Sequence, residues 1–224
     1  AAPEIAETIE TAAEAIRRGG RLIYVGAGTS GRLGVLDAAE CPPTFGVGPG
    51  CVLALIAGGD AALRRSAEGA EDNVRAAAAD LTHLEPAVSA ADIVVGITAS
   101  GTTPYVRAAL DAAKGVGAKT VLVTCNPASP IAADCVIAMP TGAEVLAGST
   151  RLKAGTATKM ALNMISTGAM TLAGYVYHGL MVGMAPVNAK LRQRAVRIIA
   201  TLTGSCEEHA AGLLDAAGGR ITVA

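Results

Sequence analysis

The sequence predicts an α/β fold, with a mainly parallel five-stranded sheet covered by helices on both faces and a small helical subdomain after it. Three observations predict this fold. Short apolar runs rich in β-branched residues alternate with segments of helical spacing, which is typical of a parallel sheet. Two strand-to-helix turns, at residues 26–31 and 100–104, combine glycine with hydroxyl side chains. After residue 184 only helical segments follow.

Five apolar runs are predicted to be strands, because each is short and is bounded by turn-forming residues. They cover residues 22–25, 52–57, 92–99, 119–125 and 135–139. The third, with the sequence DIVVGITA, is expected to be a buried strand that leads straight into the second of the two turns.

The predicted helices lie between and after these strands. They cover residues 3–18, 32–39, 61–84, 104–115, 152–172, 187–202 and 207–217. The first carries Ile5, Ile9 and Ile16 at helical spacing, and Gly19 follows its end. The second is expected to stop at the proline pair at 42–43, because proline lacks the N–H group that a helix needs.

Composition limits the classes of function. The chain has 224 residues, which is enough to bury a full core. Its 18 basic and 19 acidic residues are evenly mixed, so a polyanionic partner such as nucleic acid is disfavoured. No apolar run reaches about 18 residues, so no membrane span is expected.

Cysteine and histidine usage predicts neither disulfides nor a metal site. The five cysteines are odd in number and include no C-x-x-C pair, which favours free thiols in a reducing cytosol. The histidines, His83, His178 and His209, show no metal-ligand spacing with each other or with the cysteines. We therefore expect each histidine to be structural or exposed, and no metal to be bound.

The turn at residues 26–31, GAGTSG, predicts a phosphate cradle. Glycines let the backbone approach an anion, and the start of the following helix offers free N–H groups. The spacing also satisfies G-x-G-x-x-G, but no acidic residue follows about 20 positions later, as a dinucleotide fold requires. The hydroxyls of Thr29 and Ser30 suit a terminal phosphate better. A phosphate monoester is therefore favoured over a dinucleotide and over a purely structural turn.

A second anion contact is predicted at the start of the helix at 152–172. Gly148, Ser149 and Thr150 precede this helix, and Arg151 and Lys153 lie in its first turn. The helix dipole disfavours cations there unless an anion is bound. The alternative is a pair of solvated cations.

Five motifs together resemble the N-acetylmuramic acid 6-phosphate etherase family. They are GAGTSGR at 26–32, ECPPT at 40–44, EGAED at 68–72, ASGTTPY at 99–105 and GSTRLKAGT at 148–156. The match runs in order from about residue 3 to residue 217. The resemblance implies a sugar isomerase (SIS) domain at residues 1–184, which is a three-layer phosphosugar-binding sandwich. It also implies an incomplete C-terminal helical subdomain at residues 185–224, and a cytoplasmic homodimer.

The resemblance implies a lyase of N-acetylmuramate catabolism in peptidoglycan recycling, with no cofactor. The family cleaves the D-lactyl ether of its amino sugar phosphate by elimination across C2 and C3, followed by addition of water. Carried over to this chain, Glu40 is the acid and Glu71 the base. The expected substrate-binding residues are Gly28, Thr29, Ser30, Ser100, Gly101, Thr102, Thr103, Ser149 and Lys153.

Without the resemblance, the residues alone do not assign catalytic roles to Glu40 and Glu71. Glu68, Glu71 and Asp72 are spaced i, i+3 and i+4, so any of them could face a sugar from one helix. Glu40 could be an ordinary exposed charge. A continuous helix from residue 31 would also hold it about 13 Å from the phosphate turn. Either Glu40 serves the site of a partner subunit, or that helix is shorter.

Two other functions share this phosphate cradle. A sugar-phosphate isomerase would need a similar turn and a base near C2, although the ECPPT and EGAED segments favour the etherase. A non-enzymatic sugar-phosphate sensor is the third possibility, because the glucokinase regulatory protein is similar in this region. Such a sensor could keep both glutamates as ligand contacts.

Overall fold

A computed structural model describes residues 1–224 and has the predicted three-layer architecture. The strands are β1 (Leu22–Gly26), β2 (Val52–Ile56), β3 (Ile93–Thr98), β4 (Lys119–Thr124) and β5 (Cys135–Ala138). The helices are α1 (Ala2–Arg17), α2 (Gly28–Phe45), α3 (Ala61–Arg64), α4 (Val74–Thr82), α5 (Pro104–Gly115), α6 (Lys153–Leu172), α7 (Ala189–Thr203) and α8 (Glu207–Ala216). None of these helices combines the length and the apolar character needed to cross a membrane.

The sheet is entirely parallel, which confirms the predicted fold class. Its strand order is β2-β1-β3-β4-β5. The first crossover goes from β1 to β2 on one side, and the chain then returns to place β3 on the other side of β1. The order therefore reverses between β1 and β3, and open α/β sheets bind ligands beyond the carboxyl ends of the strands at such a point.

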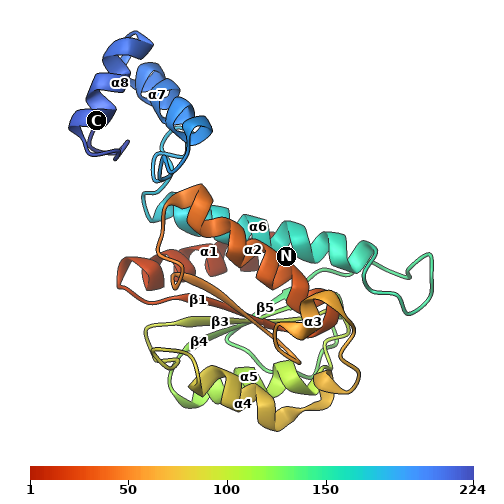
Figure 1. Cartoon of the computed structure of the whole chain (residues 1–224). Coiled ribbons are helices and arrows are strands. Elements are labelled where there is room, and N and C mark those ends of the chain that lie inside the picture. Colours follow the sequence, from red (N-terminus) through yellow and green to blue (C-terminus); the bar gives the residue numbers. More distant parts are fainter.

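The strands are buried on both faces because helices cover both. Leu22 and Tyr24 of β1 pack in the cluster that contains residues of α1, α2 and α6. Ile23 and Val25 point the other way, into the cluster formed with α4 and α5. This alternation is the two-residue period of a strand. Figure 1 shows α1, α2 and α6 above the sheet and α4 and α5 below it.

A buried carboxylate joins three of these elements. Asp37 of α2 accepts hydrogen bonds from the Tyr24 hydroxyl (2.9 Å), the Asn163 amide (2.6 Å) and the Ser166 hydroxyl (3.1 Å). Burial, together with the Asp37 carboxylate, raises the pKa of Tyr24 well above its ordinary value of 10.0. The network holds α2 against α6 and β1, and so it sets the direction of the helix that leaves the first turn.

The helix expected over residues 61–84 is wrong. The segment instead contains α3, a short 3-10 turn η1 (Ala70–Asp72) and then α4. Gly69 has φ +72° just before η1, and the side chain of Asn73 accepts a hydrogen bond from the Ala76 N–H (3.1 Å) at the start of α4. The alanine-rich sequence favours a helix, but these two turn residues interrupt it.

The expected stop at the proline pair is also wrong. Helix α2 continues through Pro42 and Pro43 to Phe45, and Gly46 follows its end with φ +69°. Both prolines lie in the last turn, so the missing N–H groups remove only two bonds near the helix end. The Gly46 N–H donates to the Pro42 carbonyl and closes the helix.

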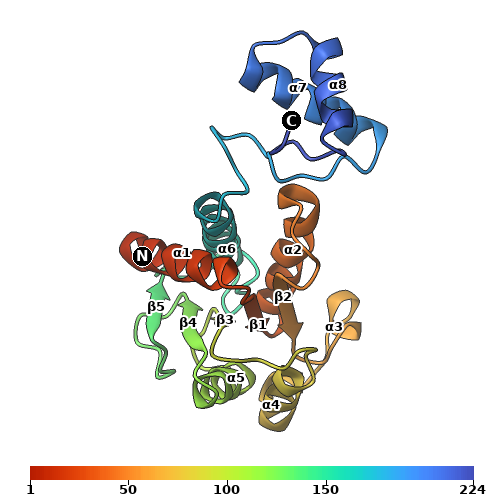
Figure 2. The ribbon, with the colours of Figure 1, turned by 90° about the vertical axis from the view of Figure 1, so that its left-hand side faces the viewer.

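The C-terminal segment has a core of its own. Helices α7 and α8 pack around Ala195, Ile199 and Leu214, and Val182 and Met184 join them from the preceding link. Figures 1 and 2 show the pair beyond the ends of α2 and α6, away from α4 and α5. The boundary between residues 184 and 185 stays a prediction.

At the amino ends of β1 and β3, a buried ion pair joins the two strands. Arg21 Nη2 lies 2.8 Å from Asp92 Oδ2, and the two side chains are 10% and 2% exposed. The Arg21 Nε and the Ser89 N–H also donate to this carboxylate. Burial alone would raise the pKa of Asp92, but these hydrogen bonds outweigh it, and the pKa lies below the ordinary value of 3.8.

We predict that Asp92→Asn lowers the free energy of unfolding by about 3 kcal/mol or more, because it leaves the Arg21 charge buried without a partner. Urea unfolding at pH 7 measures the loss. Glu14→Gln is the control, because Glu14 pairs with Arg18 on an exposed helix face, and it should cost less than about 1 kcal/mol. Equal effects of the two variants would contradict the assigned role of the pair.

The stabilisation from Asp92 should disappear in acid. Since the folded pKa lies below 3.8, the contribution is complete above that value and is lost as the pH falls through the folded pKa. We expect the stability difference between the wild type and Asp92→Asn to be constant above about pH 5 and to shrink below pH 4. Urea titrations from pH 7 to pH 2.5 test this, and a difference that stays constant throughout would contradict it.

Candidate functional site

The first strand-to-helix turn is tight on its inner side and open on its outer side. Only Ala27 separates β1 from α2. A Cβ atom on Gly31 would lie 2.6 Å from Ile56 and 2.7 Å from the Gly26 carbonyl, so only glycine fits there. Gly28 has φ +54° and nothing within 4 Å of the position of a Cβ atom. Helix α2 has no side-chain cap, so amide groups at its start remain free for an anion.

The side-chain hydroxyls of the second turn form hydrogen bonds with one another. The Thr98 hydroxyl lies 2.8 Å from that of Thr103, and the Ser100 hydroxyl lies 3.0 Å from that of Thr102. Each hydroxyl can rotate, so it can give up its bond to a neighbouring hydroxyl and donate to an oxygen of a bound phosphate instead.

The link between β4 and β5 supports this second turn from behind. The Asn126 amide donates to the Ser100 carbonyl (2.8 Å), and the Ser129 hydroxyl donates to the Gly101 carbonyl (2.6 Å). The backbone of the turn is therefore held in place while its side chains stay available.

Three predicted binding segments meet at one edge of the sheet. Strands β1 and β3 are neighbours in register, with Gly26 opposite Ile97, so both turns lie at adjacent carboxyl ends. A Cβ atom on Gly155, in the first turn of α6, would lie 3.6 Å from the Thr29 side chain. The start of α6 therefore packs against the first turn.

The chain's own carboxylate occupies the start of α6. Glu144 accepts hydrogen bonds from the backbone N–H groups of Ala154 (2.9 Å) and Lys153 (3.0 Å). These bonds hold the pKa of Glu144 below its ordinary value. These two amides are therefore not free for an external anion, so the second anion contact predicted at Arg151 and Lys153 would rest on their side chains.

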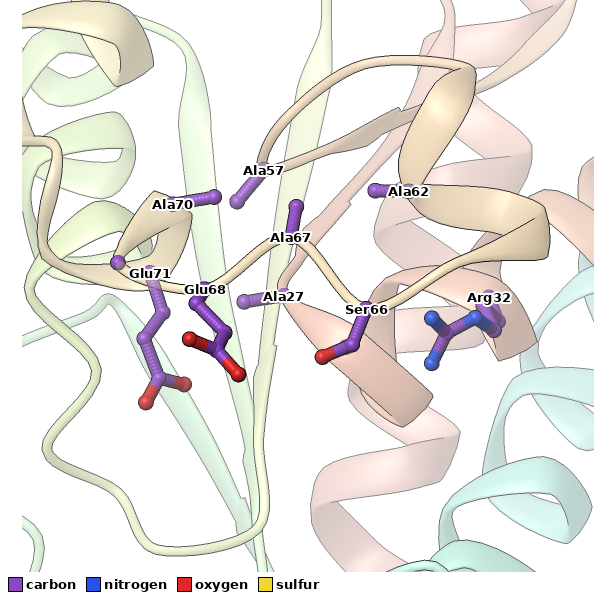
Figure 3. Close-up of a pocket in the computed structure, with 11 residues that line it drawn as sticks. Ala27, Arg32, Ala57, Ala62, Ser66, Ala67, Glu68, Ala70 and Glu71 are labelled. Atoms are coloured by element: carbon purple, nitrogen blue, oxygen red, sulfur yellow. The ribbon is translucent and has the colours of Figure 1, made fainter.

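A cavity of about 300 Å³ adjoins the first turn. It is lined by Ala27, Gly28, Arg32, Ala57, Ala62, Ser66, Ala67, Glu68, Gly69, Ala70 and Glu71. Figure 3 shows the carboxylates of Glu68 and Glu71 together at one end and Arg32 at the other, with Ser66 between them. A phosphate held at the first turn would thus have carboxylates near its sugar carbons, where they can transfer protons.

Sequence relatives identify the family. A protein from Gloeobacter violaceus named N-acetylmuramic acid 6-phosphate etherase is 58% identical over 226 residues, which cover 100% of this chain and 73% of that protein. One of the same name from an Enterobacter species is 55% identical over 214 residues, covering 95% of this chain and 71% of the relative. The chain belongs to the N-acetylmuramic acid 6-phosphate etherase family. The resemblance inferred from the five motifs is confirmed.

Domain families and solved structures agree with this etherase-family assignment. The glucokinase regulatory protein N-terminal SIS domain matches residues 4–114, and the SIS domain matches residues 73–173. A phosphoheptose isomerase from Francisella tularensis has a TM-score of 0.56 at 15% identity, covering 75% of this chain and 86% of the isomerase. At that identity the likeness shows the fold alone.

Within one chain of this etherase-family protein, Glu40 does not reach the cavity. It is exposed on α2 and is absent from the cavity lining. It lies twelve residues after Gly28, which is about 18 Å along a helix. The alternative of a shorter helix is wrong, because α2 extends past Glu40 to Phe45.

Sequence reasoning missed Arg32, Ser66 and Glu144. Arg32 is the last residue of the GAGTSGR motif, and nothing in the spacing of Arg32 or Ser66 distinguishes either from an ordinary surface residue. Glu144 precedes Lys153, the first residue of α6, by nine residues. The sequence favours Ser149 and Thr150 as caps of this helix instead, but in the structure no adjoining side chain caps it.

The remaining reactive groups lie outside the site's chemistry. All five cysteines are free thiols. Burial raises the pKa of Cys41 to about 12, so this thiol stays protonated and unreactive. No group of three or more His, Cys, Asp or Glu side chains is arranged to hold a metal ion.

We predict that Glu144→Ala loosens the first turn of α6. Amide hydrogen exchange at Lys153 and Ala154 should become about fivefold faster, because both N–H groups lose their acceptor. Glu144→Gln keeps one side-chain oxygen as an acceptor, so its exchange rates at these amides should lie between those of the wild type and of Glu144→Ala. Exchange resolved by NMR measures the effect, with Glu10→Ala on the exposed face of α1 as control. Unchanged exchange at both amides would refute the capping role.

Proposed function

We propose that this protein is a carbon–oxygen lyase that cleaves the D-lactyl ether of N-acetylmuramic acid 6-phosphate, giving N-acetylglucosamine 6-phosphate and D-lactate. The observation that carries the proposal is the shared cavity of the first turn and Glu71. Relatives at 53–58% identity that bear the etherase name support it. The reaction belongs to the breakdown of cell-wall amino sugars, and we assign it to the cytoplasm.

The proposed binding mode holds the phosphate between the two turns. Hydroxyls and amides of Thr29, Ser30 and the residues of the second turn surround it, and Lys153 supplies a positive charge from α6. The first turn forms one wall of the cavity. The sugar ring then extends from the phosphate into the cavity, toward the carboxylates.

The proposed reaction has two stages. Glu71 takes the proton from C2, a C2–C3 double bond forms, and the C3–O bond to lactate breaks as a general acid protonates the leaving oxygen. Water then adds its oxygen to C3 and a proton to C2. The sum is one substrate and one water giving N-acetylglucosamine 6-phosphate and lactate, and no oxidant or reductant is needed. Carboxyl groups suffice for both proton transfers.

We propose that the general acid is Glu40 of a second copy in a homodimer. About 18 Å of helix separate Glu40 from the first turn of its own chain. Leu36 lies one turn before it on the same exposed face of α2, and its side chain is 52% exposed. A single exposed apolar side chain is ordinary on a protein surface, so the length of α2 between Glu40 and the first turn is what supports this proposal.

A sugar-phosphate sensor is the second candidate, because the glucokinase regulatory protein SIS domain matches residues 4–114. One experiment separates the candidates. The purified protein is incubated with N-acetylmuramic acid 6-phosphate in deuterated and in ¹⁸O-labelled water. The lyase should release lactate and leave deuterium at C2 and ¹⁸O at C3. Saturable binding without lactate release would favour the sensor, and aldose–ketose interconversion would favour an isomerase.

We predict that Glu71→Gln lowers kcat for lactate release by about 1,000-fold, because the amide cannot accept the C2 proton. Glu68→Gln is the matched control, since Glu68 lines the same cavity. It should keep activity within about tenfold of the wild type. Steady-state lactate assays test both variants, and the reverse ranking would assign the base to Glu68.

Mixing two inactive variants tests the origin of Glu40. Glu40→Gln and Glu71→Gln are unfolded, mixed in equal amounts and refolded together. If a site combines Glu40 of one copy with Glu71 of the other, half of the dimers are hybrids with one intact site, and roughly a quarter of wild-type activity should return. Each variant refolded alone is the control. One variant is labelled with ¹⁵N, so that native mass spectrometry distinguishes hybrid from parental dimers. No recovery with hybrids present would place both residues in one chain.

A further inference from the structure

Arg32 lies in the cavity at the end opposite the glutamates. It is four residues after Gly28 on α2, one helical turn from the phosphate turn. In Figure 3 its guanidinium group points from α2 toward Ser66 and into the cavity. The proposed reaction gives this residue no role.

Two hydrogen bonds hold the guanidinium group in place. Its Nε donates to the Leu63 carbonyl (3.1 Å), and its Nη2 donates to the Arg65 carbonyl (3.3 Å). A guanidinium has five N–H donors, so the Nη1 and Nη2 edge keeps donors for a ligand. The group is therefore preorganised, with a free bidentate edge.

No carboxylate of the chain neutralises Arg32. None of the protein's ion pairs includes it, although Glu68 and Glu71 line the same cavity. The cavity therefore has a positive end and a negative end. An anionic group on a ligand would be repelled from the glutamates and attracted to Arg32.

We propose that Arg32 is the specificity-determining residue for the carboxylate of the substrate's ether substituent. The inference rests on the proposed function, whose substrate carries a phosphate and a lactyl carboxylate. With the phosphate at the first turn, the two negative groups need separate cationic or amide partners. The free edge of Arg32 matches a carboxylate in a bidentate geometry.

This contact would also orient the sugar. Holding the lactyl group at the Arg32 end turns the C2–C3 edge toward the wall that carries Glu71. A substituent without charge would bind in several orientations, and fewer of them would present C2 to the base. The contact thus contributes to kcat/KM through positioning as well as affinity.

Paired substrates test the inference. Lactate release from N-acetylmuramic acid 6-phosphate is compared with lactamide release from the analogue whose carboxylate is an amide. Arg32→Met should lower kcat/KM for the acid by about 10- to 100-fold and for the amide by less than about threefold. Arg32→Lys keeps the positive charge but cannot bind a carboxylate in a bidentate geometry, so its kcat/KM for the acid should lie between those of the wild type and of Arg32→Met. Arg64→Met removes an exposed arginine of α3 outside the cavity lining, and it should change neither.

The outcomes separate this role from a structural one. If Arg32 only holds the carbonyls of Leu63 and Arg65, or contacts the phosphate, both substrates lose the same factor and the inference is overturned. If Arg32→Met fails to fold, Arg32→Lys decides the question, because it must lower kcat/KM more for the acid than for the amide, and equal factors overturn the inference. Equal turnover of the two by an active wild type sinks the inference alone. No lactate release at all sinks the proposed function and the inference together.

Discussion

The parallel pairing of β1 with β3 is the constraint on which the site depends. These strands are consecutive in the sheet but not in the chain, and the crossover reverses between them. Their carboxyl ends carry the two hydroxyl-lined turns, so the pairing brings together segments about 70 residues apart. At the opposite edge, the buried Arg21–Asp92 pair joins the same two strands. The ion pair at the amino ends of β1 and β3 thus helps to hold in place the two turns at their carboxyl ends.

Helix α2 gives the site its directionality. Only Ala27 separates it from β1, and it runs unbroken for 18 residues. Near its middle, the buried Asp37 carboxylate accepts hydrogen bonds from Tyr24 of β1 and Asn163 of α6. A rigid helix of that length separates its two ends. Its first turn is the proposed phosphate site, while Glu40 lies twelve residues further along the helix, about 18 Å from Gly28. This separation is the reason for proposing that Glu40 and Glu71 act together from two different subunits.

The cavity separates charge along its length. Two carboxylates at one end and a guanidinium at the other impose an orientation on any ligand with unequal ends. The break in the helix expected over residues 61–84 makes this possible. A continuous helix would have placed Glu68 and Glu71 along its side, whereas the loop and the η1 turn bring both, still exposed, to the cavity beside the first turn. Ser66 and the Arg65 carbonyl that holds Arg32 come from the same loop, and the Leu63 carbonyl comes from α3 just before it.

Local patterns in the chain were enough for the strands, most helices, the parallel sheet and the first strand-to-helix turn, because apolar periodicity and glycine spacing act over a few residues. The same patterns misjudged the proline pair and the alanine-rich segment. There, Gly46, Gly69 and Asn73 decide where the helices end or restart, and local propensities are too weak to rank such competing turns. The cavity, the free edge of Arg32 and the cap from Glu144 depend on contacts between residues distant in the chain. Only the folded packing brings those groups within hydrogen-bond distance, because the path of the backbone between them is set by the sheet and not by their spacing in the sequence.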